Sequence, residues 1–288
     1  MKDEIIAAIK RFVLDDKENW FPLTNERFYD EPLVRFVSAS QYLFSEYKTL
    51  IGAEHVTPKE AFETEFGSGT FTSGTVLSVV LPINEKIRES NRGQKDWPSK
   101  EWVLNRTFGD GVLINKTAHY IEELLRTKGF RAIAPYSAPW FHTLKTPTGP
   151  SSIWSERHIA YAAGQGTFSL NEGLITERGI AVRLISVVTD WVLERDDGEA
   201  ETVIDHHANC LFYGKDTKCG ACIARCPVHA ITEQGHDKVA CWQYCYGEES
   251  AKVAVSFGGN PKNGAGCGLC QTGVPCEYKN PLELRTKL

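Results

Sequence analysis

The 288-residue chain lacks cysteine throughout its first 209 residues, and it lacks any run of about 18 or more apolar residues. A membrane-spanning helix needs such a run, so the second absence excludes one. A secretory signal is missing too, because the N-terminal segment MKDEIIAAIKRFVLDD carries acids from Asp3 onward and has neither a basic start nor a small-residue cleavage site. We therefore expect a cytoplasmic protein without membrane contact, in which thiols stay reduced.

Concentrated positive charge is also missing. The formal net charge is -5, the isoelectric point is near 5.9, and Lys and Arg form no run. Broad nucleic-acid binding needs clustered positive charge, so the composition argues against it and leaves only a local basic patch open. With 42% hydrophobic residues the chain is neither disordered nor fibrous. At about 150 residues per domain its length predicts two domains.

The cysteines that are present divide the chain. All nine lie at or after Cys210. In a reducing compartment, clustered cysteines are more often metal ligands than disulfides. A polar segment over residues 196–201 precedes them and has the composition of a linker. We predict a cysteine-free domain over residues 1–205 and a cysteine-built domain over residues 206–288.

The patterning of the first domain predicts helices mixed with an open sheet, the α/β (α+β) class. The segment Thr57-Pro58-Lys59-Glu60 combines an N-cap, a proline at the first helical position and a capping-box acid, so a helix begins there. Apolar spacing predicts further helices over residues 3–14, 112–129 and 156–163, the last of which Gly164 can end.

Apolar and β-branched runs predict the strands. They lie over residues 74–82, 131–135 and 179–188, and the last run is typical of a strand in the centre of a sheet. The polar stretch over residues 84–100 is predicted to be a long loop or lid. The stretch over residues 136–155, rich in Pro, Ser, Thr and aromatic residues, is predicted to be a functional or wrapping loop.

The cysteine spacing is typical of iron–sulfur ligands. Cys219-Gly-Ala-Cys222-Ile-Ala-Arg-Cys226-Pro227 matches the tail of the bacterial ferredoxin motif C-x2-C-x2-C-x3-C-P, whose last cysteine binds the other cluster in two-cluster proteins. The first position of the motif is Asp216 here, and Cys210 is its natural replacement. Structural zinc sites also use C-x2-C pairs, but they have no use for the Cys-Pro at x3 spacing.

A crossover pairing of the two halves predicts two 4Fe-4S clusters. The first cluster is assigned Cys210, Cys219, Cys222 and Cys276. The second is assigned Cys226, Cys241, Cys267 and Cys270. Cys245 is then left over. Motif position favours Cys241 over Cys245 as the ligand and leaves the alternative open.

The order of these features resembles the epoxyqueuosine reductase family and, more distantly, the corrinoid reductive dehalogenases. The resemblance is carried by the segments over residues 156–166, 171–176 and 182–190, by the run from Cys219 to Pro227, and by Cys241 with Cys267-Gly-Leu-Cys270. It implies a nitroreductase-like domain that binds cobalamin, followed by a ferredoxin-like domain with two 4Fe-4S clusters. FMN is kept as the alternative cofactor, since the same fold class often binds it.

The resemblance also directs attention to candidate residues in the first domain. Family members carry an Asp, thought to be the proton donor, a few residues before the equivalent of Glu156. Here Pro150 occupies that place. The candidate proton donors are Tyr136, His142, Glu156 and His158. The candidate cofactor contacts are Gly164, Gly166, Asn171, His206 and His207, although the glycines also suit a helix stop and a turn and the histidines suit a linker.

These observations predict a corrinoid-dependent reductase in which two clusters feed electrons to the cofactor. The expected partners are a low-potential ferredoxin or flavodoxin as electron donor and a small or tRNA-borne substrate. Two alternatives stay open. One is an electron carrier that reduces the corrinoid of a partner enzyme, and the other is a flavin-containing reductase.

Overall fold

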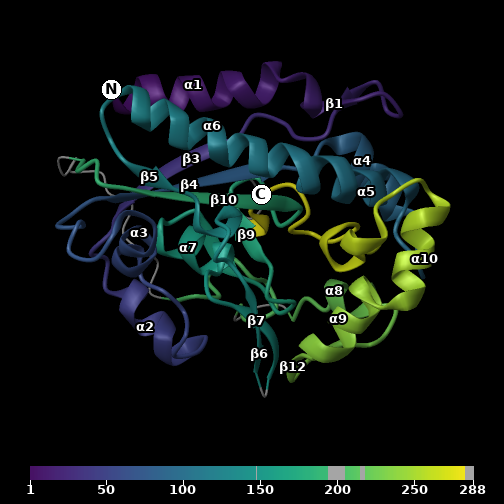
Figure 1. Cartoon of the computed structure of the whole chain (residues 1–288). Coiled ribbons are helices and arrows are strands. Elements are labelled where there is room, and N and C mark those ends of the chain that lie inside the picture. The colour runs from purple at the N-terminus through teal and green to yellow at the C-terminus, as the bar shows by residue number, and fades with distance from the viewer. Residues whose placement is uncertain (147, 194–204, 215–217, 283–288) are drawn as a thin grey trace.

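A four-stranded antiparallel sheet forms the centre of the first domain. The computed structural model describes residues 1–146, 148–193, 205–214 and 218–282, so the polar segment over 196–201 and Asp216 lie outside it. The strand order is β3-β4-β10-β5 (Figure 1). These strands span Leu33–Ser38, Thr75–Pro82, Val182–Thr189 and Ala132–Ile133. The strands expected over residues 74–82, 131–135 and 179–188 are confirmed, and β10 is central.

Helices cover both faces of this sheet, and therefore all eight residues of β4 are buried. Above the sheet in Figure 1 lie α1 (Lys2–Asp15) and α6 (Ile114–Thr127), which pack Ile5, Ile9 and Ile121 against Leu77 and Val79. Below the sheet lie α2 (Leu43–Leu50), α3 (Pro58–Phe66) and α7 (Glu156–Ala162). These three helices pack around Val76 and Val188 of the sheet. The predicted mixture of helices and strands is confirmed.

The helix signals in the sequence hold in the structure. Thr57 caps α3 through a full capping box, in which its side chain accepts from Glu60 N and the Glu60 carboxylate accepts from Thr57 N at 2.8 Å. Gly164 follows α7 with a φ of 68°, the left-handed conformation that ends helices. A π-helix over Asn105–Leu113 precedes α6, and its presence was not expected.

Two predicted loops were wrong. Residues 84–100 contain α4 (Glu85–Arg92), followed by α5 (Lys100–Leu104). The apolar periodicity is weak there because α4 buries the polar residues Arg88 and Asn91 beside Ile87. Residues 136–155 contain the end of a 3-10 helix (Pro135–Ser137) and a hairpin of β6 (Thr143–Thr146) and β7 (Gly149–Ser152). The strand signal is weak because β7 begins with Gly149 and Pro150, two residue types that are rare in strands.

The remaining elements are short. In the first domain they are the 3-10 helix Lys17–Asn19, β1 (Trp20–Phe21), β2 (Glu26–Arg27), β8 (Gly166–Phe168) and β9 (Leu174–Thr176). The cysteine-rich region contains α8 (Ala221–Ala224), β11 (Ile231–Thr232), β12 (Gly235–His236), α9 (Lys238–Tyr246), α10 (Glu248–Ser256) and 3-10 helices at Pro261–Asn263 and Leu269–Gln271. Within the described ranges, no helix is long and apolar enough to cross a membrane.

The cysteine-rich region packs directly on the first domain (Figure 1). Trp97 stacks on Tyr244 with ring centroids 4.4 Å apart. Gly268, between two cysteines, lies flat against the buried ring of Trp102, and a Cβ at Gly268 would come within 2.0 Å of that ring. Contacts as close as these join the two predicted domains into one packed unit.

We expect Gly268→Ala to destabilise the protein more than Gly258→Ala. Both glycines have a positive φ, so each substitution costs about 1–2 kcal/mol of backbone strain. Only Gly268 has a ring in the way, which adds overpacking of about 1–3 kcal/mol, whereas a Cβ at Gly258 meets no atom within 4 Å. Denaturant unfolding of both variants measures the difference. Equal losses would contradict the role of the Trp102 contact.

Candidate functional site

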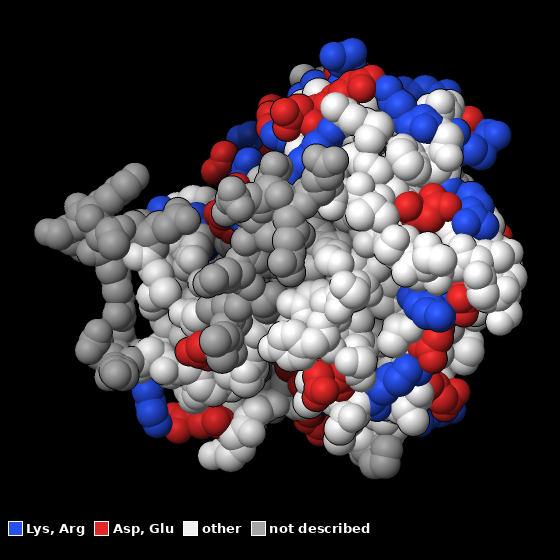
Figure 2. Space-filling view, turned by 90° about the vertical axis from the view of Figure 1, so that its left-hand side faces the viewer, with Lys and Arg blue, Asp and Glu red and all other residues white. Residues whose placement is uncertain are grey.

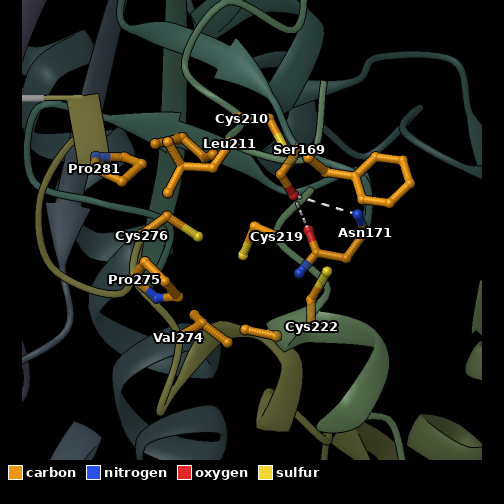
Figure 3. Close-up of a pocket in the computed structure, with 13 residues that line it drawn as sticks. Ser169, Asn171, Cys210, Leu211, Cys219, Cys222, Val274, Pro275, Cys276 and Pro281 are labelled. Atoms are coloured by element: carbon orange, nitrogen blue, oxygen red, sulfur yellow. Dashed lines mark hydrogen bonds between the residues drawn. The ribbon is translucent and has the colours of Figure 1, made fainter. Parts of the chain in front are cut away.

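Four cysteines surround one pocket between the two regions. The pocket is lined by Cys210, Cys219, Cys222 and Cys276, and by Ser169, Asn171 and Ile175 of the first domain, among other residues. Figure 3 shows the sulfur atoms of Cys219 and Cys276 turned toward the middle of this ring. The pocket encloses about 350 Å³ between protein atoms, its open mouth included. These four are the cysteines that the spacing assigned to the first cluster.

Two thiols of this ring, those of Cys222 and Cys276, are difficult to ionise in the absence of a metal. Burial, together with the neighbouring Cys210 and Cys219, raises the pKa of Cys222 to about 11. Burial and the same neighbours also raise the pKa of Cys276 well above its usual value. Thiolates that lie close together without a positive charge between them repel one another. A coordinated cation compensates their negative charge and so allows all of them to ionise.

The other five cysteines form a second group. Cys241 and Cys245 stand four residues apart on α9, so both lie on one face of it. The thiol of Cys241 interacts electrostatically with those of Cys245, Cys270 and Cys267, and the thiol of Cys267 interacts with that of Cys226. The carbonyl of Cys245 accepts from Gly266 N at 3.2 Å and from Ser250 Oγ at 2.6 Å, which attaches the end of α9 to the residues just before Cys267.

The structure thus gathers five thiols where four ligands were assigned. Cys241 and Cys245 hydrogen-bond to each other, and this bond raises the pKa of Cys241 and lowers that of Cys245. The preference for Cys241 over Cys245 therefore stays a prediction. Across the part of the chain that the structure describes, no group of three or more His, Cys, Asp or Glu side chains is placed to hold a single metal ion.

Asn171 and the histidine pair hold the two regions together. Asn171 Nδ2 donates to Cys270 O at 3.0 Å, and its Oδ1 accepts from Gly173 N at 2.9 Å. His207 Nδ1 lies 3.0 Å from Phe168 O, and the His207 ring stacks on Tyr213 with centroids 3.9 Å apart. Phe168 N donates to His206 O at 2.7 Å. These contacts fix the segment before Cys210, and a cofactor contact of the three residues stays a prediction.

The two candidate glycines have local packing roles. The carbonyl of Gly164 accepts from Arg35 Nη1 at 2.6 Å. Gly166 lies in β8, where a Cβ would come within 2.2 Å of the carbonyl oxygen of Ile175 in β9. Both glycines are therefore required by the backbone around them, and their approach to a cofactor also stays a prediction.

Glu156 is the most unusual of the four candidate proton donors. Both of its carboxylate oxygens are buried, and neither makes a hydrogen bond of full geometry to a described residue. Burial raises the pKa of Glu156 to about 7, although looser hydrogen-bonding contacts with Ser186 and Trp154 offset part of this rise. A carboxyl group with such a pKa holds a proton near neutrality and can release it.

The other three candidates are less suited to donating a proton. Burial lowers the pKa of His158 to about 3, so its ring is neutral, and its Nδ1 lies 2.8 Å from Ser155 Oγ. His142 is exposed, and its Nδ1 lies 3.1 Å from the carbonyl of Trp140. Tyr136 packs against Phe141 with ring centroids 4.8 Å apart. Burial raises the pKa of Tyr136, and Arg106 lowers it in part.

A buried charge group at the π-helix was missed by the sequence analysis. Asp110 accepts from Arg106 Nη1 at 2.9 Å, from Arg183 Nε at 2.7 Å and from the hydroxyl group of Tyr29 at 2.5 Å. Arg106 also donates to the Tyr246 hydroxyl at 2.7 Å, which links the group to the end of α9. The residues lie far apart in sequence and form no motif, so only the fold could reveal them.

Comparisons with known proteins find similarity in structure alone. No protein-family model matches the sequence, and no curated protein does. A selenomethionine-labelled epoxyqueuosine reductase superimposes over 96% of this chain with a TM-score of 0.51 and 15% identity. The chain has the fold of an epoxyqueuosine reductase. The resemblance stated from the sequence is thereby confirmed at the level of fold.

Two further solved structures are similar to the chain. An epoxyqueuosine reductase from Bacillus subtilis, with its catalytic loop swung out of the active site, matches 97% of the chain and 66% of its own length, at 17% identity and a TM-score of 0.48. An epoxyqueuosine reductase with a modified tRNA stem loop matches 96% of the chain and 65% of its own length, at 16% identity and a TM-score of 0.46. The chain spans 65% of the first structure too.

The pKa of Glu156 predicts how stability depends on pH. The folded state keeps the proton up to about pH 7, whereas the unfolded state loses it near 4.5. Stability is therefore full below about pH 4.5, falls as the pH rises toward 7, and then levels, a loss of about 3 kcal/mol. Glu156→Gln should flatten this dependence in unfolding experiments from pH 4 to 8. An unchanged slope in the variant would contradict the assignment.

Proposed function

We propose that the chain is a corrinoid-dependent reductase of the epoxyqueuosine reductase type, with two 4Fe-4S clusters as its electron supply. The observation that carries the proposal is the ring of four cysteines around one pocket, beside a domain with the matching fold. Residues 1–205 would form the nitroreductase-like cofactor domain. Residues 206–288 would form the ferredoxin-like domain that delivers electrons.

The cysteines fit two clusters. A cubane cluster is bound by four cysteine thiolates that surround a space large enough for the cluster. A single zinc ion instead requires its four ligands to meet around one atom. Cys210, Cys219, Cys222 and Cys276 line such a space. Cys226, Cys241, Cys267 and Cys270 would hold the second cluster. The glycines beside them, such as Gly266 and Gly268, both with positive φ, let the backbone turn tightly around the thiols.

Buried polar atoms without partners support a cofactor site in the first domain. Besides the Glu156 oxygens, Ser78 Oγ and Gln165 Oε1 make no hydrogen bond of full geometry to a described residue. Ser78 lies opposite Ser186 across β4 and β10, where α7 covers the sheet. Buried polar groups are normally paired, and a molecule that displaced the residues covering these atoms would supply their partners. A corrinoid bound there would supply the cobalt centre that accepts electrons.

Glu156 would supply the proton for the reduction from its carboxyl group. It takes over the role of the aspartate that the family carries nearby, whose place Pro150 occupies in β7. Its raised pKa suits the task, because a general acid works best with a pKa near the operating pH. Tyr136, which is 48% exposed, is the alternative donor. Of the two, Glu156 has the lower pKa and so gives up its proton more readily.

The substrate would be a small molecule or a modified base on tRNA, and a ferredoxin or flavodoxin would be the electron donor. One structure of the same fold contains a tRNA stem loop. In this chain, basic and acidic side chains lie intermingled on the face in Figure 2, and the net charge is -5. This charge pattern favours a small substrate over extended contact with nucleic acid.

Metal and cofactor content test the proposal. The full chain is purified anaerobically, reconstituted with iron and sulfide, incubated with hydroxocobalamin or with FMN, and separated from free cofactor. We expect about eight irons per chain, four for each cubane, and retained cobalamin. Bound zinc without iron would contradict the clusters. Retention of FMN alone would favour a flavin reductase, and retention of neither cofactor would favour an electron carrier.

Serine variants test the ligands of the second cluster. Cys241→Ser should cost one cluster, and thus about four irons per chain, because it removes a proposed ligand. Cys245→Ser is the matched control on the same helix face and should keep both clusters. Iron and acid-labile sulfide are measured after anaerobic reconstitution. The reverse outcome would make Cys245 the ligand.

A further inference from the structure

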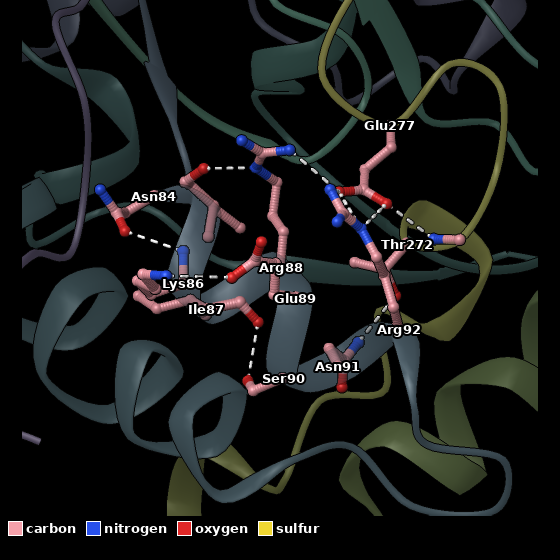
Figure 4. Close-up of polar contacts among 12 residues, drawn as sticks. Asn84, Lys86, Ile87, Arg88, Glu89, Ser90, Asn91, Arg92, Thr272 and Glu277 are labelled. Carbon is pink, nitrogen blue, oxygen red and sulfur yellow. Dashed lines mark hydrogen bonds and ion pairs between the residues drawn. The ribbon is translucent and has the colours of Figure 1, made fainter. Parts of the chain in front are cut away.

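Glu277 is a buried carboxylate that directly follows Cys276 and binds the first domain. The residue is 2% exposed. Glu277 accepts from Arg88 Nη1 at 2.9 Å and from Arg92 Nη2 at 2.6 Å (Figure 4). Arg88 and Arg92 stand four residues apart on α4, so both guanidinium groups leave the same face of that helix. This cluster of charges lies outside the sites described above.

The backbone around Cys276 is attached to the first domain as well. Ile180 N donates to Cys276 O at 2.8 Å, and Ala181 N donates to Glu277 O at 3.0 Å. The approach requires glycine at position 179, where φ is 78° and a Cβ would come within 2.4 Å of Glu277 O. These residues lead directly into the central strand β10. Cys276 is therefore attached to the segment that leads into the central strand of the sheet.

Glu277 also closes the turn that carries Cys276. Gly273 N donates to Glu277 Oε2 at 2.7 Å, and Glu277 N donates to Val274 O at 3.1 Å. The side chain and the backbone of one residue thus hold both ends of the turn over residues 273–277. The turn carries the Cys276 side chain, whose sulfur atom points into the pocket in Figure 3.

We propose that Glu277, held by Arg88 and Arg92, positions Cys276 as a cluster ligand and sets the charge beside the first cluster. This rests on the proposed function, since it takes Cys276 as a ligand. Two guanidinium groups face one carboxylate, which leaves an excess of positive charge beside Glu277, where burial weakens screening by salt. Glu85 and Glu89 also interact with Arg92, from its own helix. Positive charge nearby favours the reduced, more negative cluster, and so raises its reduction potential.

Two variants change this charge in opposite directions. Glu277→Gln leaves both guanidinium groups without a counter-charge, and Arg92→Gln leaves a neutral pair of Arg88 and Glu277. In the reconstituted full chain we expect the potential of the first cluster to rise in Glu277→Gln and to fall in Arg92→Gln. Any shift of the second cluster should be smaller, because Glu277 directly follows a ligand of the first cluster only. Redox titrations followed by EPR measure both potentials. A role in stability alone would not produce shifts of opposite sign.

A remote ion pair supplies the control. Asp16, which directly follows α1, forms an ion pair of 2.7 Å with Lys116 in α6. The variant Asp16→Asn breaks this pair and should change neither reduction potential. Shifts in the same direction for Glu277→Gln and Arg92→Gln, or no shift, would overturn the proposal. If Glu277→Gln does not fold, Arg92→Gln decides alone, because the partly exposed Arg92 is the milder change.

Alkylation of the metal-free protein separates this proposal from the proposed function. With the turn loosened, Cys276 should react faster in Glu277→Gln than in wild type, as peptide mass spectrometry measures, while Cys245 should react at the same rate in both. An unchanged rate for Cys276 would count against positioning even if no cluster were bound. Wild-type protein that takes up no iron would contradict the proposed function.

Discussion

The attachment of the cysteine-rich region to the start of β10 is the constraint on which the rest of the structure depends. That region has short helices and two-residue strands, and its small apolar cluster includes Leu170, Ile175 and Ile180 of the first domain. Its order comes from contacts with the sheet, where Cys276 and Glu277 extend along residues 180–181. Removing one partner of a buried ion pair such as Arg88–Glu277 typically costs about 3–5 kcal/mol. Bound clusters would add their own binding energy to folding, as metals do in small metal-binding domains.

Charged or titratable groups are buried at three places around this attachment, two with the same balance of charge and one without a charged partner. Glu277 is outnumbered by two arginines, and so is Asp110. Glu156 has no cationic partner and keeps its proton instead. The proposed electron path therefore runs past surplus positive charge, which favours reduction, and the proposed reaction site contains a neutral acid. The paired carboxylates and the protonated Glu156 follow from the same rule, that a buried ionisable group is either paired with an opposite charge or neutral.

The sequence predicted the parts of the fold that depend on local pattern. The apolar runs of β4 and β10 and the capping box of α3 carry their own signals, and all three are in the structure. Helix α4 was missed because its buried face is polar, for a reason that only the fold contains: Arg88 meets Glu277, 189 residues away along the chain. The β6–β7 hairpin was missed because Pro150 weakens its strand pattern.

At the candidate site, too, the sequence predicted the features that form a motif and missed those that only the fold brings together. The ferredoxin-like motif, with a crossover pairing of its two halves, grouped Cys210, Cys219, Cys222 and Cys276 from sequence alone, and these four line one pocket. Spacing could not show that Cys245 lies beside Cys241 in the second group. It could not show the environment of Glu156 either, since a desolvated carboxylate is a property of packing.

The EPR spectrum of the reduced full chain after anaerobic reconstitution tests the central claim most directly. Two 4Fe-4S clusters held side by side in one small region should interact magnetically when both are reduced by dithionite. The account predicts the broadened, split signal of two coupled clusters, together with iron and acid-labile sulfide in equal amounts. The signal of one isolated cluster, or a silent spectrum from protein that contains zinc, would contradict it.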